Sequence, residues 1–290
     1  MKPTLIFTAL LAANLGNAQD FSKVQVQTTK VAGNVHMLVG AGGNIGVSVG
    51  NDGVLIVDDQ FKELAPKIRA AIAKLTPGPI KFVINTHWHG DHTGGNSALG
   101  DKAIIVAHEN VRKRMSVEQF SKFFNKTIPA SPKAALPIIT FDGNITIYFN
   151  DEPIRIVHLP SGHTDTDSMV IFEKSKVAHL GDEYFSEGWP FIDLESGGTV
   201  RGYISNLETV IKTLDGGYKV IPGHGPKAGT VEDVKTFHQV LSDSSKFVLE
   251  KKKAGKTLDA IKKEGLPEQW SKWGKGFIDN DRWIETVFNG

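Results

Sequence analysis

The amino-acid sequence predicts an α/β protein in which helices and β-sheet pack together in layers. Short runs of β-branched and aromatic residues, which are typical of strands, recur in both halves of the 290-residue chain and are separated by turn residues. Longer segments with apolar residues at helical spacing lie between and after these runs. Strands and helices in this order can bury their apolar faces only in a layered sheet-plus-helix architecture.

The N-terminal half is expected to be rich in strands. Strands are predicted at residues 24–39 (two strands around Gly33-Asn34), 44–49, 54–57, 80–85 and 103–106. Asn51-Asp52-Gly53 separates two of them, and because Asp-Gly favours a tight turn we expect a hairpin there. Residues 62–75 have helical periodicity and precede Pro77-Gly78, which predicts a helix that ends at this point. Another helix is expected to begin within residues 108–115.

The C-terminal half is predicted to begin with hairpins and to end with helices. The hairpins combine residues 144–149 with 154–159 and residues 169–172 with 176–180, and a further strand is expected at 218–221. An amphipathic helix is predicted at 200–214, a long helix at 231–252, and more helices beyond it. We find no short repeat or low-complexity linker, so residues 19–290 are predicted to form a single domain.

Residues 117–136 form an aromatic and proline-rich segment that contains Phe120, Phe123 and Phe124. The spacing of the aromatic residues favours a helix followed by a loop. This segment could flank the functional site and hold an apolar group of the substrate. Alternatively, its rings could pack into the core, as aromatic residues at helical spacing usually do.

Residues 1–18 have the pattern of a secretory signal peptide. Lys2 precedes an apolar run from Leu5 to Leu15, and small residues lead to Ala18. The run is shorter than the roughly 20 apolar residues that span a bilayer. We therefore expect cleavage and export, to the periplasm or the medium. A buried N-terminal helix is the alternative.

Composition limits the kinds of partner. The net charge of +1 argues against a dedicated nucleic-acid-binding protein. No other segment is long and apolar enough to suggest a membrane span. The chain contains no cysteine, which is compatible with export and excludes thiolate metal sites. The expected partner is a small-molecule substrate.

The strongest functional signal is the run His87-Trp88-His89-Gly90-Asp91-His92, which follows the predicted strand at 80–85. Imidazole nitrogens and carboxylate oxygens are the usual zinc ligands outside cysteine sites. His87 and His89 would point the same way in an extended segment, so both could reach one metal. Asp91 and His92 lie beyond Gly90, which favours a second ion. A surface loop that is merely rich in histidine is the alternative.

Three later segments repeat one pattern, in which a predicted strand is followed by a glycine and one candidate ligand. They are Gly162-His163, Gly181-Asp182 and Gly223-His224. Any one of them alone would be typical of a turn. Their recurrence at several strand ends indicates a shared site, because loops held by a sheet commonly carry binding residues.

With these motifs the chain resembles the metallo-β-lactamase superfamily, whose signature is His-x-His-x-Asp-His followed by a distant His, Asp and His. The resemblance covers nearly all of residues 19–290. It implies a four-layer αββα sandwich of two mixed β-sheets flanked by helices, with two zinc ions at one edge. The implied ligands are His87, His89 and His163 for the first ion, Asp91, His92 and His224 for the second, and Asp182 as a bridge. Asp58 matches an early buried aspartate that supports the metal ligands without binding the metal itself.

The ligand set separates the chain from several branches of that superfamily. One β-lactamase subclass carries Arg in place of His92 and Cys in place of Asp182, and it is excluded because this chain has no cysteine. Another subclass lacks the bridging Asp. The diiron oxygen-reducing branch usually has Glu where His89 stands, which disfavours redox chemistry. The set is closer to glyoxalase II, lactonases and a group of secreted hydrolases.

The chemistry of these ligands predicts hydrolysis. Zinc lowers the pKa of bound water to about 7, so a hydroxide that bridges two ions could attack a carbonyl carbon. Asp91 is the candidate catalytic residue, because it could orient the hydroxide and pass on a proton. Two zinc ions outweigh the charges of Asp91, Asp182 and a hydroxide, so the site should attract carboxylate-bearing substrates. Tyr184 and Trp189 follow Asp182 and are candidates for the wall of the substrate pocket.

We therefore predict a zinc hydrolase that opens a small cyclic or activated carbonyl compound, most of all a β-lactam-like amide. Lactone and thioester hydrolysis are close alternatives. A non-catalytic metal-binding protein with the same fold is an alternative of another class. Iron or manganese could replace zinc at nitrogen and oxygen ligands.

Overall fold

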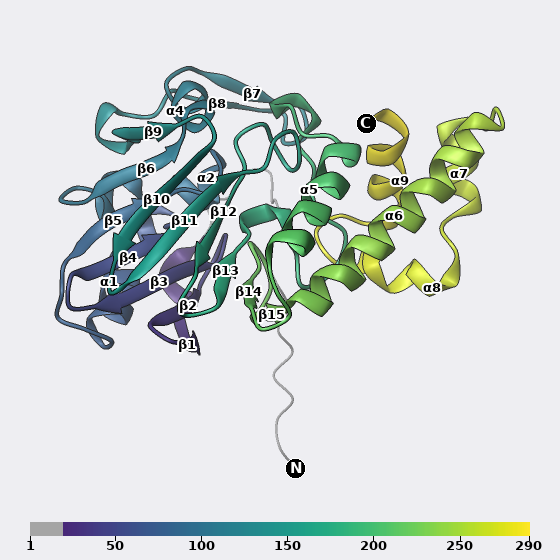
Figure 1. The fold of residues 1–290 in the computed structure, drawn as a ribbon. Helices are drawn as coiled ribbons and strands as arrows, with labels where there is room; N and C mark the ends of the chain where they lie inside the picture. Colours follow the sequence, from purple (N-terminus) through teal and green to yellow (C-terminus); the bar gives the residue numbers. More distant parts are fainter. Residues whose placement is uncertain (1–19) are drawn as a thin grey trace, which may run out of the picture.

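The computed structural model describes residues 20–290 (Figure 1). The predicted signal segment at residues 1–18 lies outside the described residues, and its assignment stays a prediction. The boundary of a single domain at 19–290 likewise stays a prediction.

The first large sheet has seven strands in the order β1-β2-β3-β4-β5-β6-β9. Its strands are β1 (Gln27–Ala32), β2 (Val35–Val39), β3 (Ile45–Gly50), β4 (Gly53–Val57), β5 (Ile80–Ile84), β6 (Ile104–His108) and β9 (Ile139–Phe141). Neighbours from β1 to β4 are antiparallel, whereas β4, β5, β6 and β9 are parallel. The predicted hairpin at Asp52-Gly53 is confirmed, with Gly50 paired to Gly53.

The second large sheet has six strands in the order β10-β11-β12-β13-β14-β15. Its strands are β10 (Asn144–Phe149), β11 (Glu152–His158), β12 (Ser168–Phe172), β13 (Val177–His179), β14 (Lys219–Ile221) and β15 (Gly229–Thr230). Only the β13–β14 pair is parallel, so this sheet is also mixed. Both predicted hairpins in this half are confirmed.

Helices follow or separate the strands. The α-helices are α1 (Ala65–Ala73), α2 (Gly90–Thr93), α3 (Asn96–Leu99), α4 (Glu109–Met115), α5 (Val200–Thr213), α6 (Val231–Lys253), α7 (Leu258–Glu264), α8 (Glu268–Ser271) and α9 (Asn280–Asn289). Short 3-10 turns occur at Phe21–Lys23, Lys62–Leu64, Lys133–Ala135, Gly181–Glu183, Leu194–Ser196 and Lys272–Lys275. The predicted helices at 62–75, 200–214 and 231–252 are therefore confirmed to within a few residues. None of the helices in residues 20–290 combines the length and the apolar character needed to cross a bilayer.

Three apolar layers hold these elements together. Leu55 and Val57 of β4 pack between the sheets, against residues such as Ile156 of β11. Val54 and Ile56, on the opposite face of β4, pack against α1. The outer face of the second sheet packs against α5, α6 and the C-terminal helices, which lie beside it in Figure 1. The order is helix, sheet, sheet, helix, so the predicted αββα sandwich is confirmed.

The strand ends place the candidate ligands along one edge of the sandwich. The histidine-rich run follows β5, His163 follows β11, Asp182 follows β13 and His224 follows β14. Asn44, which precedes β3, joins the two sheets at this edge. Its amide Nδ2 donates to the carbonyl oxygens of Pro222 at 3.0 Å and Gly225 at 2.9 Å. The loop that carries His224 is thereby fixed to the first sheet.

The expected helix within residues 117–136 is wrong. This segment forms a separate hairpin of β7 (Gln119–Ser121) and β8 (Lys126–Ile128). Asn125 has a φ of 47°, and its amide donates to the carbonyl oxygen of Lys122 at 3.1 Å, so the chain reverses there instead of continuing as a helix. Phe120, Phe123 and Phe124 are 55%, 36% and 39% exposed, which also contradicts the alternative that they pack into the core.

The C-terminal helices are anchored by a buried indole pair. Trp283 of α9 is fully buried, and its ring stacks on that of Trp189 with centroids 4.9 Å apart. Its indole Nε1–H donates to Ser244 Oγ of α6 at 3.0 Å. The loop that follows Asp182 is therefore packed against the end of the chain.

We expect Trp283→Ala to lower the free energy of unfolding by about 3–5 kcal/mol, because it removes a large buried ring and leaves a cavity. Urea denaturation followed by circular dichroism measures this change. Leu249→Ala on α6 is the control: its side chain is 46% exposed, so an effect within about 0.5 kcal/mol is expected. Equal effects of the two substitutions would contradict the proposed anchoring.

Candidate metal centre

The seven predicted ligands lie together in the structure. Their donor atoms form three groups in which all members lie within 4.8 Å of one another. The groups are His87 with His89 and His163, His87 with His92 and Asp182, and Asp91 with His92 and His224. The four segments that carry them are far apart in the sequence, so the site exists only in the folded chain.

The first group is built from three imidazoles. His163 Nε2 lies 2.8 Å from His89 Nδ1. The ring centroid of His87 is 4.9 Å from that of His89 and 4.7 Å from that of His163, and both pairs are nearly perpendicular. Perpendicular rings whose nitrogens converge can direct their lone pairs to one point, as a tetrahedral metal ion requires.

The group of Asp91, His92 and His224 combines two imidazoles with a carboxylate. Asp91 Oδ2 lies 3.3 Å from His224 Nε2 and 3.7 Å from His92 Nε2, and the two histidine nitrogens are 3.4 Å apart. Atoms bound to one tetrahedral zinc ion at about 2.0–2.1 Å lie roughly 3.3 Å apart. The spacing of this group therefore fits a common ion.

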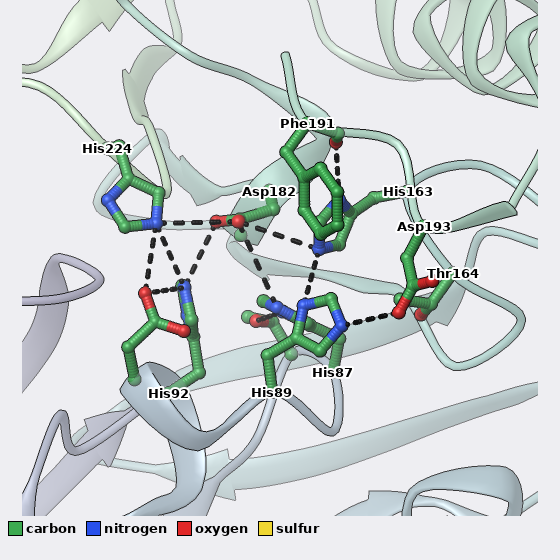
Figure 2. Close-up of polar contacts among 12 residues, drawn as sticks. His87, His89, His92, His163, Thr164, Asp182, Phe191, Asp193 and His224 are labelled. Atoms are coloured by element: carbon green, nitrogen blue, oxygen red, sulfur yellow. Dashed lines mark hydrogen bonds and ion pairs between the residues drawn. The ribbon is translucent and has the colours of Figure 1, made fainter. Parts of the chain in front are cut away.

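Asp182 lies between His163 and His224, as Figure 2 shows, and so between the group of His87, His89 and His163 and the group of Asp91, His92 and His224. Its Oδ1 is 3.1 Å from His92 Nε2, and its Oδ2 is 3.4 Å from His224 Nε2 and 3.6 Å from His163 Nε2. The backbone carbonyl of Asp182 accepts a hydrogen bond from the Tyr203 hydroxyl of α5 at 2.7 Å. Gly223 permits this placement, because a Cβ there would collide with Asp182 Oδ1.

Hydrogen bonds on the outer nitrogens of His163 and His89 leave their inner nitrogens free. His163 Nδ1 donates to the Phe191 carbonyl at 2.7 Å, and His89 Nε2 donates to Asp193 Oδ2 at 2.9 Å. The inner atoms, His163 Nε2 and His89 Nδ1, then carry lone pairs. Such outer partners are what orient histidine ligands in metal sites.

Asp58 orients the other two buried imidazoles, His92 directly and His87 through Thr86. Its Oδ2 is 2.7 Å from His92 Nδ1. Thr86 donates its hydroxyl to the same oxygen at 2.8 Å and lies 3.0 Å from His87 Nδ1. His87 Nε2 is buried and has no hydrogen-bond partner in the described structure, which a metal ion would explain. The donor set therefore fits a divalent cation.

The buried site shifts the pKa values of its groups in opposite directions. Burial lowers the pKa of His163 to about 4 and that of His87 well below its usual range. Burial also acts on His224, but Asp182 and Asp91 outweigh it and raise the pKa of this imidazole to about 9. Without metal, His224 therefore carries a proton at pH 7 and bridges the two carboxylates.

The predicted pocket residues Tyr184 and Trp189 do not line this site. Both are buried in the core, at 4% and 2% exposure, where Tyr184 packs against Phe237 and Trp189 against Trp283. The neighbouring residue in the chain is the one that reaches a ligand: the Phe185 ring stacks on His224 with centroids 5.2 Å apart.

Sequence reasoning missed three residues at the site. Asp193 and Phe191 contact His89 and His163, and Glu183 Oε1 accepts the backbone N–H of His163 at 3.2 Å. Glu183 directly follows Asp182, and this position next to a predicted ligand was the only feature of the sequence that could have identified it as a site residue. Burial and the neighbouring Asp167 raise the pKa of Glu183 well above its usual range.

We expect Asp193→Asn to weaken zinc binding by about 10–100-fold, the usual effect of losing an outer partner of a histidine ligand. Asp193 accepts from His89 Nε2 with Oδ2 and from the backbone N–H groups of Glu195 and Ser196 with Oδ1. Asn has only one side-chain oxygen, so one of these sets of donors would lose its acceptor. Competition with a chromophoric chelator measures the affinity. Asp215→Asn, which alters an exposed carboxylate, is the control, and equal affinities for both variants would contradict the role of Asp193.

We expect zinc uptake by the metal-free protein at pH 7 to release at least one proton. A histidine ligand must be neutral, and the pKa of His224 at about 9 means that it is protonated before metal binds. Affinity should therefore rise with pH up to about 9. Calorimetry in buffers of different ionisation enthalpy measures the release, and an enthalpy independent of the buffer would contradict it.

Sequence relatives match about half of the chain. A probable metallo-hydrolase of Methanocaldococcus jannaschii is 28% identical over 156 residues, which cover 50% of this chain and 70% of the relative. The beta-lactamase-like protein 2 homolog of Caenorhabditis elegans is 24% identical over 52% of this chain, but the match spans only 44% of that relative.

Solved structures share the fold at low identity. A metallo-beta-lactamase from Pontibacter korlensis has a TM-score of 0.60 at 17% identity and covers 75% of this chain and 99% of its own. A stereoselective inverting sec-alkylsulfatase from Pseudomonas sp. has a TM-score of 0.67 at 14% identity and covers 91% of this chain and 50% of its own. The family profile described as the metallo-beta-lactamase superfamily matches residues 38–231. With this match, with the αββα fold and with the clustered His and Asp ligands, the chain belongs to the metallo-beta-lactamase superfamily of metallo-hydrolases.

Proposed function

We propose that the protein is an exported dinuclear zinc hydrolase that opens a small cyclic or activated carbonyl compound, with β-lactam-like amides as the leading substrate class. The observation that supports this most is the convergence of the complete ligand set around Asp182. We assign His87, His89 and His163 to one ion, Asp91, His92 and His224 to the other, and Asp182 to both. Export is proposed from the signal-like residues 1–18.

The bound ions and the protein residues would make separate contributions to the reaction. When bound, the two ions lower the pKa of water and polarise the carbonyl group of the substrate. Asp58, Asp193 and the Phe191 carbonyl hold the imidazoles in orientation, so little rearrangement is needed. His87 and His163 are fully buried, which limits the access of bulk water on their side of the site.

Asp91 is the residue that we assign to proton transfer. Its side chain is 24% exposed, whereas that of Asp182 is 6% exposed, so Asp91 can reach both the ligand cluster and an incoming substrate. Burial would raise the pKa of Asp91, but His92 and His224 outweigh it and hold this pKa below the usual range, so the carboxylate is ionised and would hold a proton only briefly before passing it on. The proton would then pass to the leaving nitrogen, oxygen or sulfur atom.

The charge of the loaded site favours anionic substrates. Two divalent ions carry more positive charge than Asp91 and Asp182 neutralise. A substrate with a carboxylate beside its scissile bond would be attracted and oriented. β-Lactams and many activated carbonyl compounds have this feature.

The substrate class is tested on zinc-loaded protein with nitrocefin, an N-acyl homoserine lactone, S-lactoylglutathione and, because of the sulfatase-like fold, a sec-alkyl sulfate. We expect turnover of nitrocefin above that of the other three. Turnover of the lactone or thioester alone would replace the β-lactam assignment. If no compound is cleaved by protein that holds two zinc ions, a non-catalytic metal-binding role is favoured.

Asp91→Asn is expected to lower kcat on the best substrate by roughly 10²–10⁴, the usual contribution of a positioned acid–base group. Metal content is measured in parallel, because Asp91 is also a proposed ligand. Asp215→Asn is the matched control at an exposed carboxylate and should leave kcat unchanged. Full activity of Asp91→Asn with its zinc retained would remove Asp91 from the mechanism.

A further inference from the structure

Four phenylalanine rings, which we call the aromatic cluster, form one contact network. They are Phe123, Phe124, Phe191 and Phe277. The centroids of Phe123 and Phe191 are 4.7 Å apart, those of Phe123 and Phe277 are 5.6 Å apart, and those of Phe124 and Phe277 are 6.2 Å apart. These separations are typical of interacting aromatic rings.

The aromatic cluster borders the proposed first metal site. The Phe191 ring lies 6.0 Å from the ring of His89 and 5.8 Å from that of His163, measured between centroids. Figure 2 shows Phe191 beside His163, on the side of the site away from His224. The aromatic cluster therefore adjoins the imidazoles of His89 and His163 directly.

The cluster is built from three segments that meet only in the folded chain. Phe123 and Phe124 occupy the turn of the β7–β8 hairpin, Phe191 lies in the loop after Asp182, and Phe277 precedes α9. The hairpin is tied to the metal-site loop by Glu195, whose Oε2 accepts the Lys122 N–H at 2.7 Å and whose Oε1 is 3.1 Å from Lys122 Nζ. A two-stranded hairpin is marginally stable alone, so these contacts hold its rings in place.

Exposure distinguishes this cluster from ordinary packing. Phe123 and Phe124 keep 36% and 39% of their surface open to solvent, although they belong to a connected aromatic group. Exposed apolar surface that is contiguous and rimmed by polar groups commonly marks a binding site. The guanidinium carbon of Arg282 lies 5.4 Å from the Phe123 centroid, a cation–π contact that further restricts this ring.

We propose that the aromatic cluster is a specificity subsite for an aryl substituent carried by the substrate next to its scissile group. The occupant is argued from position: Phe191 adjoins both His89 and His163, so a substituent that extends from a reacting group at these ligands toward the hairpin meets the cluster. This proposal rests on the proposed metallo-hydrolase function. Phe277 lies beyond residues 38–231, the part that the superfamily profile matches, so the complete subsite depends on this chain's own C-terminal segment.

The test uses two thiol carboxylates that bind zinc and differ by one phenyl group, 2-mercapto-3-phenylpropanoate and 2-mercaptopropanoate. Calorimetry on the zinc-loaded protein gives the Kd of each, and no turnover is needed. We expect the phenyl compound to bind about tenfold more tightly, because burial of its ring against the cluster adds apolar and aromatic contacts. In the double variant Phe123→Ala/Phe124→Ala this ratio should fall close to one.

Two further variants make the result specific. Tyr148→Ala removes a ring that is 81% exposed on β10, outside the cluster, and should leave the ratio unchanged. Phe124→Ala alone keeps most of the hairpin packing and should lower the ratio in the same direction by less. It provides the measurement if the double variant does not fold, which circular dichroism reports.

The outcomes separate the two proposals. Equal Kd values for the two probes in the unmodified protein, or a ratio that the double variant leaves intact, would overturn the subsite even if nitrocefin is hydrolysed. A tenfold ratio that disappears in the variant supports the subsite even if every compound in the substrate panel stays intact. Protein that takes up no metal would overturn both proposals.

Discussion

The structure of the site depends on the electrostatic attraction between buried carboxylates and the imidazoles that surround them. Asp182 is 6% exposed and lies within 4.0 Å of four histidine nitrogens, on His87, His92, His163 and His224. A carboxylate at this depth is costly unless positive charge surrounds it. Protonated imidazoles supply that charge without metal, and cations would supply it with metal. The ligand loops therefore have a common physical reason to converge.

The sheets limit the conformational freedom of the ligand loops, because each ligand segment follows a strand that is buried on one or both faces. Asp58 illustrates how the site draws on the scaffold. It follows the fully buried β4 and has a φ of 63°, a conformation that non-glycine residues seldom adopt. Its backbone N–H donates to Ile84 at 2.8 Å, and its carboxylate orients Thr86 and His92. Backbone strain at such a position is typical of functional sites.

The surroundings of the ligands are asymmetric, so the two proposed ions would differ in how open their ligands are to solvent and substrate. His87 and His163 are enclosed, and the aromatic cluster continues from their side of the site. Asp91 and His224 are more open, with side chains 24% and 19% exposed. The aromatic cluster and the carboxylate of Asp91 would thus contact a substrate from different directions, which is how a single metal pair can select both chemistry and substrate shape.

The layered fold and the candidate ligands could be predicted from the sequence, because strand periodicity, glycine punctuation and a dense His/Asp run are local signals. The tertiary structure alone decided what surrounds the ligands. Tyr184 and Trp189 turned into the core while Phe185 and Phe191 turned toward the site, since the irregular loop after β13 has no fixed side-chain period. The hairpin at Phe123 and the contact of Asp193 with His89 depend on pairings between distant segments, about which a local pattern carries no information.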